Sequence, residues 1–147
     1  MAKFSQRSKD ALKGVHPDLV RVMEAAIVDT PQDFTIVEGV RTAARQAELY
    51  AQGRTIKGKA VKGPIVTKAD GVTKKSNHQV KADGYGHAVD LYPYYDGKVQ
   101  VQDEDVPRRL RVIANHIKGK ALQMGIAITW GGDWANMYDP PHFELKQ

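Results

Sequence analysis

Apolar residues recur at helical spacing in two long stretches of the chain. In residues 16–30 and 106–124 they stand three or four positions apart, which is typical of a helix that buries one face. Gly125 is placed to end the second helix. A shorter helix is predicted after Thr42, which suits a helix N-cap, and Gly53 is placed to end it.

Short stretches rich in β-branched and aromatic residues predict strands. They cover residues 33–40, 88–92, 126–130 and 142–145. In the second of these, Asp90 alternates with Val89 and Leu91, so it lies in or near the core. Because helices and strands are mixed without regular β-α-β alternation, we expect an α+β fold with a small, mainly antiparallel sheet and flanking helices.

The segment between the predicted helix at 43–53 and the strand at 88 has no sustained period. It carries six lysines between residues 54 and 75, together with several glycines and a proline. We therefore predict a long exposed loop over about 54–87. Loops of this length usually have a function or move.

Length and composition indicate one globular domain over residues 1–147. The apolar fraction of 41% and the charged fraction of 27% are ordinary for such a domain. No apolar run is long enough for a membrane span, and the N-terminus lacks the apolar stretch of a signal peptide, so we expect synthesis in the cytoplasm. The net charge of +5 favours a polyanionic environment, but no basic stripe indicates nucleic-acid binding.

Candidate metal ligands fall in two clusters. The chain has no cysteine, so a metal would be held by His, Asp or Glu. An unpaired carboxylate at Asp90 would be costly in an apolar strand, and a metal explains it economically. The first cluster runs from Ser76 through His78 and His87 to Asp90, and the second from Asp139 through His142 to Glu144.

These clusters resemble the zinc D-alanyl-D-alanine peptidases of the VanX and VanY type and the related phage L-alanyl-D-glutamate endolysins. Their first motif, Ser-x-His-x-x-Gly-x-Ala-x-Asp, is matched in order by Ser76, His78, Gly86, Ala88 and Asp90. The chain departs from the motif by about five extra residues between the histidine and the glycine. Such an insertion costs little free energy if it bulges outward. The resemblance implies a hedgehog/D-Ala-D-Ala-peptidase-like fold with a zinc cleft.

The insertion leaves His87 as an alternative ligand to His78. His87 occupies the variable position of the Gly-x-Ala-x-Asp element, and on a strand it would not share a side with Asp90. Motif order and strand alternation both favour His78. The second motif, Asp or Glu followed two residues later by His, is matched by Asp139 and His142.

The resemblance assigns roles to these residues. It implies that His78, Asp90 and His142 bind Zn²⁺, that Asp139 is the catalytic base, and that Arg41 stabilises the oxyanion. Glu144 is either a partner of a ligand imidazole or a solvent-facing strand residue. Substrate contacts are expected from four further residues, which are Ser76, Trp130, Asp133 and Trp134.

The predicted function is zinc-dependent hydrolysis of the L-alanyl-D-glutamate bond in peptidoglycan stem peptides by a phage endolysin. The alternatives are a D-alanyl-D-alanine carboxypeptidase or dipeptidase, and a non-catalytic zinc-containing wall-binding module. We expect a monomer that binds peptidoglycan, binds no nucleic acid and inserts into no membrane. It would stay in the host cytoplasm until a holin gives it access to the cell wall.

Overall fold

A five-stranded antiparallel sheet is the centre of the fold. The computed structural model describes residues 2–56, 58–63, 65, 67–72 and 75–146. The sheet has the order β1-β4-β7-β6, and β5 pairs with the end of β4. Its strands are β1 (Phe34–Glu38), β4 (Ala88–Tyr95), β5 (Lys98–Val99), β6 (Ile128–Trp130) and β7 (His142–Leu145). This architecture confirms the predicted α+β class with a mainly antiparallel sheet.

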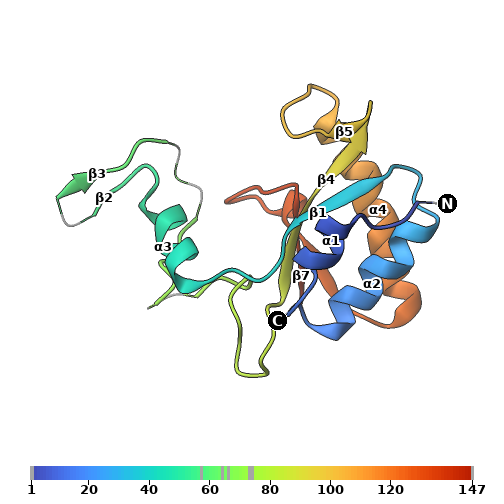
Figure 1. The fold of residues 1–147 in the computed structure, drawn as a ribbon, viewed down its shortest axis with the longest axis horizontal. Coiled ribbons are helices and arrows are strands. Elements are labelled where there is room, and N and C mark those ends of the chain that lie inside the picture. Colours follow the sequence, from blue (N-terminus) through green and yellow to red (C-terminus); the bar gives the residue numbers. More distant parts are fainter. Residues whose placement is uncertain (1, 57, 64, 66, 73–74, 147) are drawn as a thin grey trace.

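Helices cover one face of this sheet (Figure 1). α2 (Pro17–Val28) and α4 (Val106–Met124) pack against each other, and α4 also contacts β4 and β6. α1 (Gln6–Ala11) lies beside β1, where the Ile36 N–H donates to Ser8 Oγ at 3.0 Å. The apolar core lies between these helices and the sheet. Its fully buried members include Leu19, Met23, Ile36, Leu91, Leu110, Ile113, Ile117 and Phe143.

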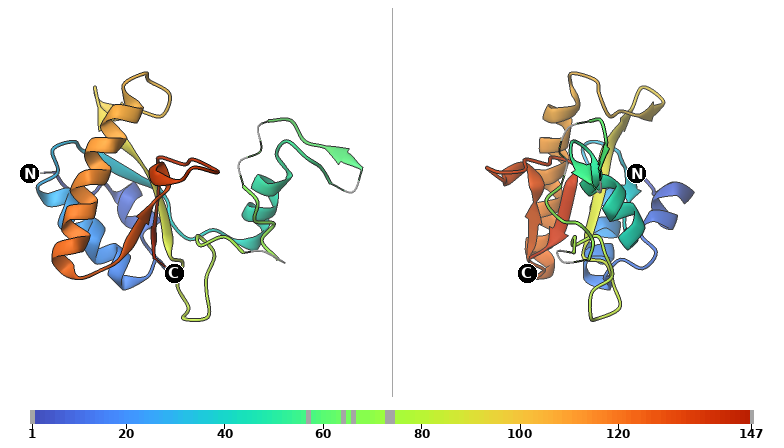
Figure 2. Two further views of the ribbon diagram at one scale, coloured as in Figure 1. Left: turned by 180° about the vertical axis from the view of Figure 1, so that it is seen from behind. Right: turned by 90° about the vertical axis from the view of Figure 1, so that its left-hand side faces the viewer.

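The segment that follows β1 projects away from this core as an arm. It begins with α3 (Ala43–Ala51), whose N-cap Thr42 accepts a hydrogen bond from the Arg45 N–H as predicted. It continues through a hairpin of β2 (Thr55–Ile56) and β3 (Lys59–Ala60) and returns along residues 67–72. Figures 1 and 2 show α3 and this hairpin standing apart from the sheet. We call the described part of residues 43–72 the arm.

Several short elements differ from the sequence prediction. The hairpin of β2 and β3 lies in the segment predicted as loop, and α1 and the 3-10 turn η1 (Gly131–Asp133) were not predicted. α1 has only six residues, too few to show a helical period, and Ser5 caps it by accepting from the Ser8 N–H. Among the described residues, no helix is both long and apolar enough to cross a membrane.

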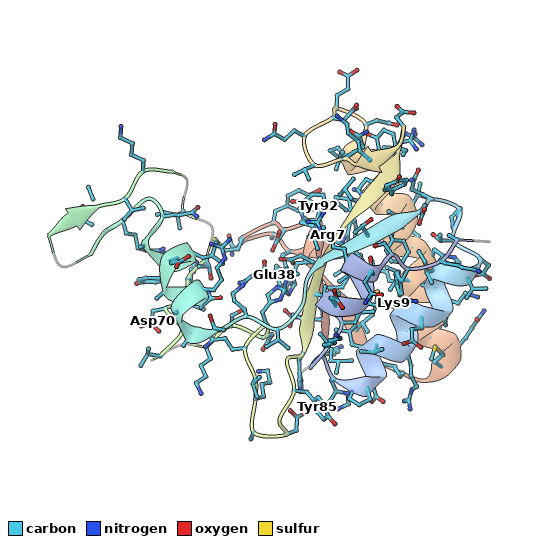
Figure 3. The ribbon with its side chains drawn as sticks, viewed as in Figure 1. Arg7, Lys9, Glu38, Asp70, Tyr85 and Tyr92 are labelled. Carbon is cyan, nitrogen blue, oxygen red and sulfur yellow. The ribbon has the colours of Figure 1, made fainter. Side chains whose placement is uncertain are left out.

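The residues inserted between His78 and Gly86 form an outward loop. Tyr85 lies at its far end in Figure 3. The loop is closed by the Lys81 N–H, which donates to the Tyr85 carbonyl at 2.9 Å. Gly86 fastens its base to the N-terminal segment, because its N–H donates to the Gly14 carbonyl and its carbonyl accepts from the His16 N–H. The insertion therefore leaves the body of the protein and returns to it at fixed points.

Candidate active site

Strand register places two of the candidate ligands side by side. Asp90 of β4 pairs directly with His142 of β7. Their neighbours Val89, Leu91 and Phe143 are fully buried in the core, so Asp90 and His142 face the opposite side of the sheet. The antiparallel pairing therefore brings together a carboxylate and an imidazole that are 52 positions apart in the chain.

A β-bulge in β1 adds Glu38 to the same face. Ile36 pairs with Leu91, but Glu38 rather than Val37 pairs with Asp90. Without the shift, strict alternation would put Glu38 on the core side together with Ile36. The bulge instead turns its carboxylate towards the site, and Figure 3 shows Glu38 between the sheet and the arm.

His78 reaches the site on a loop that backbone hydrogen bonds hold on both sides. The Arg41 N–H donates to the His78 carbonyl at 2.8 Å, and the His87 N–H donates to the Asn77 carbonyl at 2.7 Å. Gly86 permits this close approach, since a Cβ there would lie 2.9 Å from the His78 carbonyl oxygen. His78 is almost fully buried as a result.

The three candidate ligand atoms form a nearly equilateral triangle. His78 Nε2 lies 3.1 Å from His142 Nδ1, and each of these nitrogens lies 3.3 Å from Asp90 Oδ1. Ligands bound tetrahedrally at about 2.0–2.1 Å from zinc would be about 3.3–3.4 Å apart. Asp90 Oδ1 is buried and has no hydrogen-bond partner among the described residues, which fits a carboxylate oxygen that binds a metal ion.

Hydrogen bonds at the far side of each imidazole fix its tautomer. The Gly39 carbonyl lies 2.9 Å from His78 Nδ1, so that nitrogen carries the proton and donates it. Glu144 Oε1 accepts in the same way from His142 Nε2 at 2.6 Å, and Glu144 Oε2 accepts from Asn77 Nδ2 at 2.7 Å. Two nitrogen lone pairs consequently face each other across 3.1 Å, an arrangement that a cation between them stabilises.

The electrostatics of the triangle favour a positive charge at its centre. Burial disfavours the charged form of Asp90, but His78 and His142 outweigh it and hold the pKa of Asp90 well below its usual range. Burial also lowers the pKa of His142, but the neighbouring carboxylates of Asp90 and Glu144 more than compensate and raise it to about 9. The site thus attracts either a proton or a metal cation.

Asp139 lies at the edge of the triangle on a loop that packs closely against Gly131. Its Oδ2 is 3.9 Å from His142 Nδ1, and its carbonyl accepts from the His142 N–H at 3.0 Å. Gly131 accepts from the Asp139 N–H, and a Cβ on Gly131 would lie only 2.2 Å from the Asp139 carbonyl oxygen. Burial, followed by the charge of Asp90, raises the pKa of Asp139, which makes it a better proton acceptor.

Arg41 is anchored among polar side chains. It donates from Nε and Nη2 to the two oxygens of Glu38 at 2.8 and 3.1 Å, and from Nη1 to Gln46 Oε1 at 2.8 Å. A longer contact of 3.5 Å joins Nη2 to Asp90 Oδ2, the oxygen outside the triangle. Arg41 therefore orients the candidate ligand Asp90, and its contact with a substrate carbonyl stays a prediction.

These residues line a cavity of about 330 Å³ between the sheet and the arm. Ser76 and Trp134 also line it, and the Trp134 ring is 5.1 Å from the ring of His142. Two other predicted substrate contacts lie elsewhere. Trp130 is a core residue at the end of β6 that stacks on Phe143 and donates to the Pro140 carbonyl. Asp133 pairs with Lys118 of α4.

His87, the alternative ligand, belongs to a separate cluster. Its Nε2 is 2.6 Å from Asp83 Oδ2, and His16 Nε2 is 3.8 Å from the same oxygen. His16 Nδ1 accepts from the Asp18 N–H, so its remaining proton sits on Nε2 and that nitrogen has no lone pair for a metal. The cluster therefore places the inserted loop against His16, the N-cap of α2.

Three residues that line the cavity or bond to Arg41 were not predicted from the sequence as site residues. Glu38 required the bulge, Gln46 is the only buried residue of a helix whose other residues are exposed or half-buried, and Lys68 is one of many loop lysines. In the sequence, a glutamine at the fourth position of a helix resembles any solvent-exposed position. Its burial follows only from the return of residues 67–71 over α3.

Comparison with known proteins agrees with this geometry. The chain is 30% identical over 145 residues to the L-alanyl-D-glutamate peptidase of Escherichia phage T5, covering 99% of this chain and 90% of that protein. It is 32% identical over 124 residues to the peptidoglycan L-alanyl-D-glutamate endopeptidase CwlK of Bacillus subtilis (strain 168), covering 84% and 66% of the two chains. The crystal structure of the L-Ala D-Glu endopeptidase ChiX of Serratia marcescens superposes with a TM-score of 0.72 at 33% identity, covering 97% and 89%. Residues 1–145 match the model of the phage L-alanyl-D-glutamate peptidase family, and the chain belongs to that family.

Proposed function

We propose that this peptidase is a zinc-dependent endopeptidase that hydrolyses the L-alanyl-D-glutamate bond of peptidoglycan stem peptides. The observation that carries the proposal is the triangle of His78 Nε2, Asp90 Oδ1 and His142 Nδ1, with sides of 3.1 to 3.3 Å. Two nitrogens and one carboxylate oxygen suit zinc, whereas calcium and magnesium prefer oxygen alone. Three protein ligands leave a position open, as in catalytic rather than structural zinc sites.

When bound, zinc supplies Lewis acidity, which lowers the pKa of a water molecule and polarises a carbonyl group. The chain's own residues would carry out the proton transfers. Asp139 accepts the proton of the attacking water and then gives it to the departing amine of glutamate. Its raised pKa suits both steps, because the carboxylate must hold the proton between them.

Other side chains would keep the ligands in place during the reaction. Glu144 holds the tautomer of His142, and Arg41 orients Asp90 through the oxygen that faces away from the metal position. We further propose that Arg41 lends positive charge to the developing oxyanion, since four of its five N–H groups already have acceptors and one of the Nη1 protons remains.

The relatives support the bond and the setting that we propose. Both curated relatives and the solved structure are named for the L-alanyl-D-glutamate bond, which favours it over the D-alanyl-D-alanine bond. Because the family is one of phage peptidases, we propose a monomeric endolysin that accumulates in the host cytoplasm and meets the cell wall after a holin opens the membrane.

Digestion of purified peptidoglycan tests the proposal. Mass analysis of the fragments should find new glutamate amino termini and new alanine carboxyl termini with zinc, and neither after a chelator. Released D-alanine would instead indicate the carboxypeptidase. Zinc binding without any fragments would indicate a wall-binding module and refute the proposal.

A further inference from the structure

The proposed substrate carries a negative charge next to the bond that is cut. Glutamate has two carboxyl groups, and its amine is part of the L-alanyl-D-glutamate bond. The stem peptide continues through only one of the carboxyls, so the other is a free carboxylate unless it is amidated. A cleft for this substrate therefore needs a cation close to the glutamate side of the scissile bond.

Most charge in the cavity has the wrong sign for such a carboxylate. Four acidic side chains line it, which are Glu38, Asp90, Asp139 and Glu144. The lining also holds two side chains with a permanent positive charge, Arg41 and Lys68. Arg41 is 9% exposed and already bonded to two carboxylates, and its one remaining N–H group is the one that we assign to the oxyanion. Lys68 is exposed and has no hydrogen bond or ion pair with another described residue.

A chain of hydrogen bonds holds Lys68 relative to the candidate zinc site. Gln46 Nε2 donates to the Thr67 hydroxyl at 3.1 Å and to the Ala69 carbonyl at 2.8 Å, on either side of Lys68. Gln46 is fully buried, and its Oε1 accepts from Arg41, which in turn contacts Asp90. The backbone at Lys68 is thus tied to a ligand of the site.

We propose that Lys68 binds the free carboxylate of the substrate's D-glutamate and so selects stem peptides in which that group is not amidated. The inference rests on the proposed function. Gln46 is its positioning residue, since it holds both neighbours of Lys68. The arm then has a role in substrate selection, because it adds to the cavity lining an ammonium group that has no ion-pair partner among the described residues.

Two peptides that differ in one group test this role. One contains L-Ala-D-Glu with the free carboxylate, and the other contains the amide in its place. We expect the wild-type enzyme to have a kcat/KM about tenfold higher for the carboxylate, a modest value because the lysine is exposed. Lys68→Gln should bring the ratio of the two kcat/KM values close to one, mainly through KM, and Lys68→Arg should restore much of the preference.

Lys62→Gln is the matched control, because Lys62 is an exposed lysine of the same arm outside the cavity lining. This variant should keep the wild-type ratio. If wild type cleaves the carboxylate peptide and Lys68→Gln keeps the preference, the role of Lys68 is refuted while the proposed function stands. If wild type with zinc cleaves neither peptide nor peptidoglycan, the proposed function itself fails.

Discussion

Glu144 offers the sharpest test of the candidate zinc site, because it contacts the metal position only through His142. Its Oε1 accepts the His142 Nε2 proton at 2.6 Å, while its Oε2 is held by Asn77 at 2.7 Å. Glu144→Gln keeps the size of the side chain and can keep an oxygen acceptor, but it removes the charge that makes the imidazole more basic. Loss of such a partner typically weakens metal binding 10- to 100-fold, or about 1.4–2.7 kcal/mol.

The assay is competition for zinc against a chelator of known affinity, with the melting temperature of the metal-free protein measured alongside. We expect Glu144→Gln to weaken zinc binding by about tenfold and Glu144→Ala by more, since alanine also leaves the Asn77 amide without its acceptor. Glu48→Gln is the control, because Glu48 is an exposed residue of α3 that pairs only with Arg45 among the described residues. An unchanged zinc affinity in both Glu144 variants, with the fold intact, would refute the reasoning.

Three further predictions concern the same site. Asp139→Asn should keep stoichiometric zinc and the wild-type melting temperature but lower kcat at least about a hundredfold. His142→Ala should lose both zinc and turnover. Metal analysis and turnover measured on the same samples test both expectations. His78→Ala should abolish stoichiometric zinc and His87→Ala should retain it; the reverse result would exchange their roles. Gly131→Ala should lower kcat/KM at least about tenfold and the free energy of unfolding by about 1–3 kcal/mol, because its Cβ would lie 2.2 Å from the Asp139 carbonyl oxygen. A variant with the wild-type rate and melting curve would contradict this prediction.

Local patterns predicted the parts of the fold that local physics determines. The helix predicted at 106–124 has the observed bounds, and Gly125 ends it with a φ of +71°. Thr42 caps α3, and the strand at 142–145 is found where its pattern indicates. Each depends on side-chain spacing or on a cap next to the element. The hairpin of β2 and β3 has strands of only two residues, too short for any period.

The residue types of the site were predictable, and Glu144 was one of two alternatives for a partner of a ligand imidazole, but the other supporting contacts were not. Asp90 and His142 follow from alternation and motif order, and the structure brings them together with His78. The tautomer-fixing carbonyl of Gly39 and the bulge at Glu38 depend on pairing between distant segments. So does the position of Gly39, where a Cβ would lie 1.9 Å from the Ala11 carbonyl oxygen, because α1 packs directly against it. No single stretch of sequence carries that information.

The insertion after His78 shows why spacing along a chain constrains a site less than the contacts at each end. His78 is held through its own carbonyl by the Arg41 N–H, and Asn77 is held by the His87 N–H, so both bonds lie outside the inserted residues. Gly86 returns the chain to the body through bonds to Gly14 and His16. With both ends fixed, the entropy of a longer loop is its main cost, and this grows slowly with length. The loop can therefore lengthen without moving His78 Nε2 from its place 3.3 Å from Asp90 Oδ1.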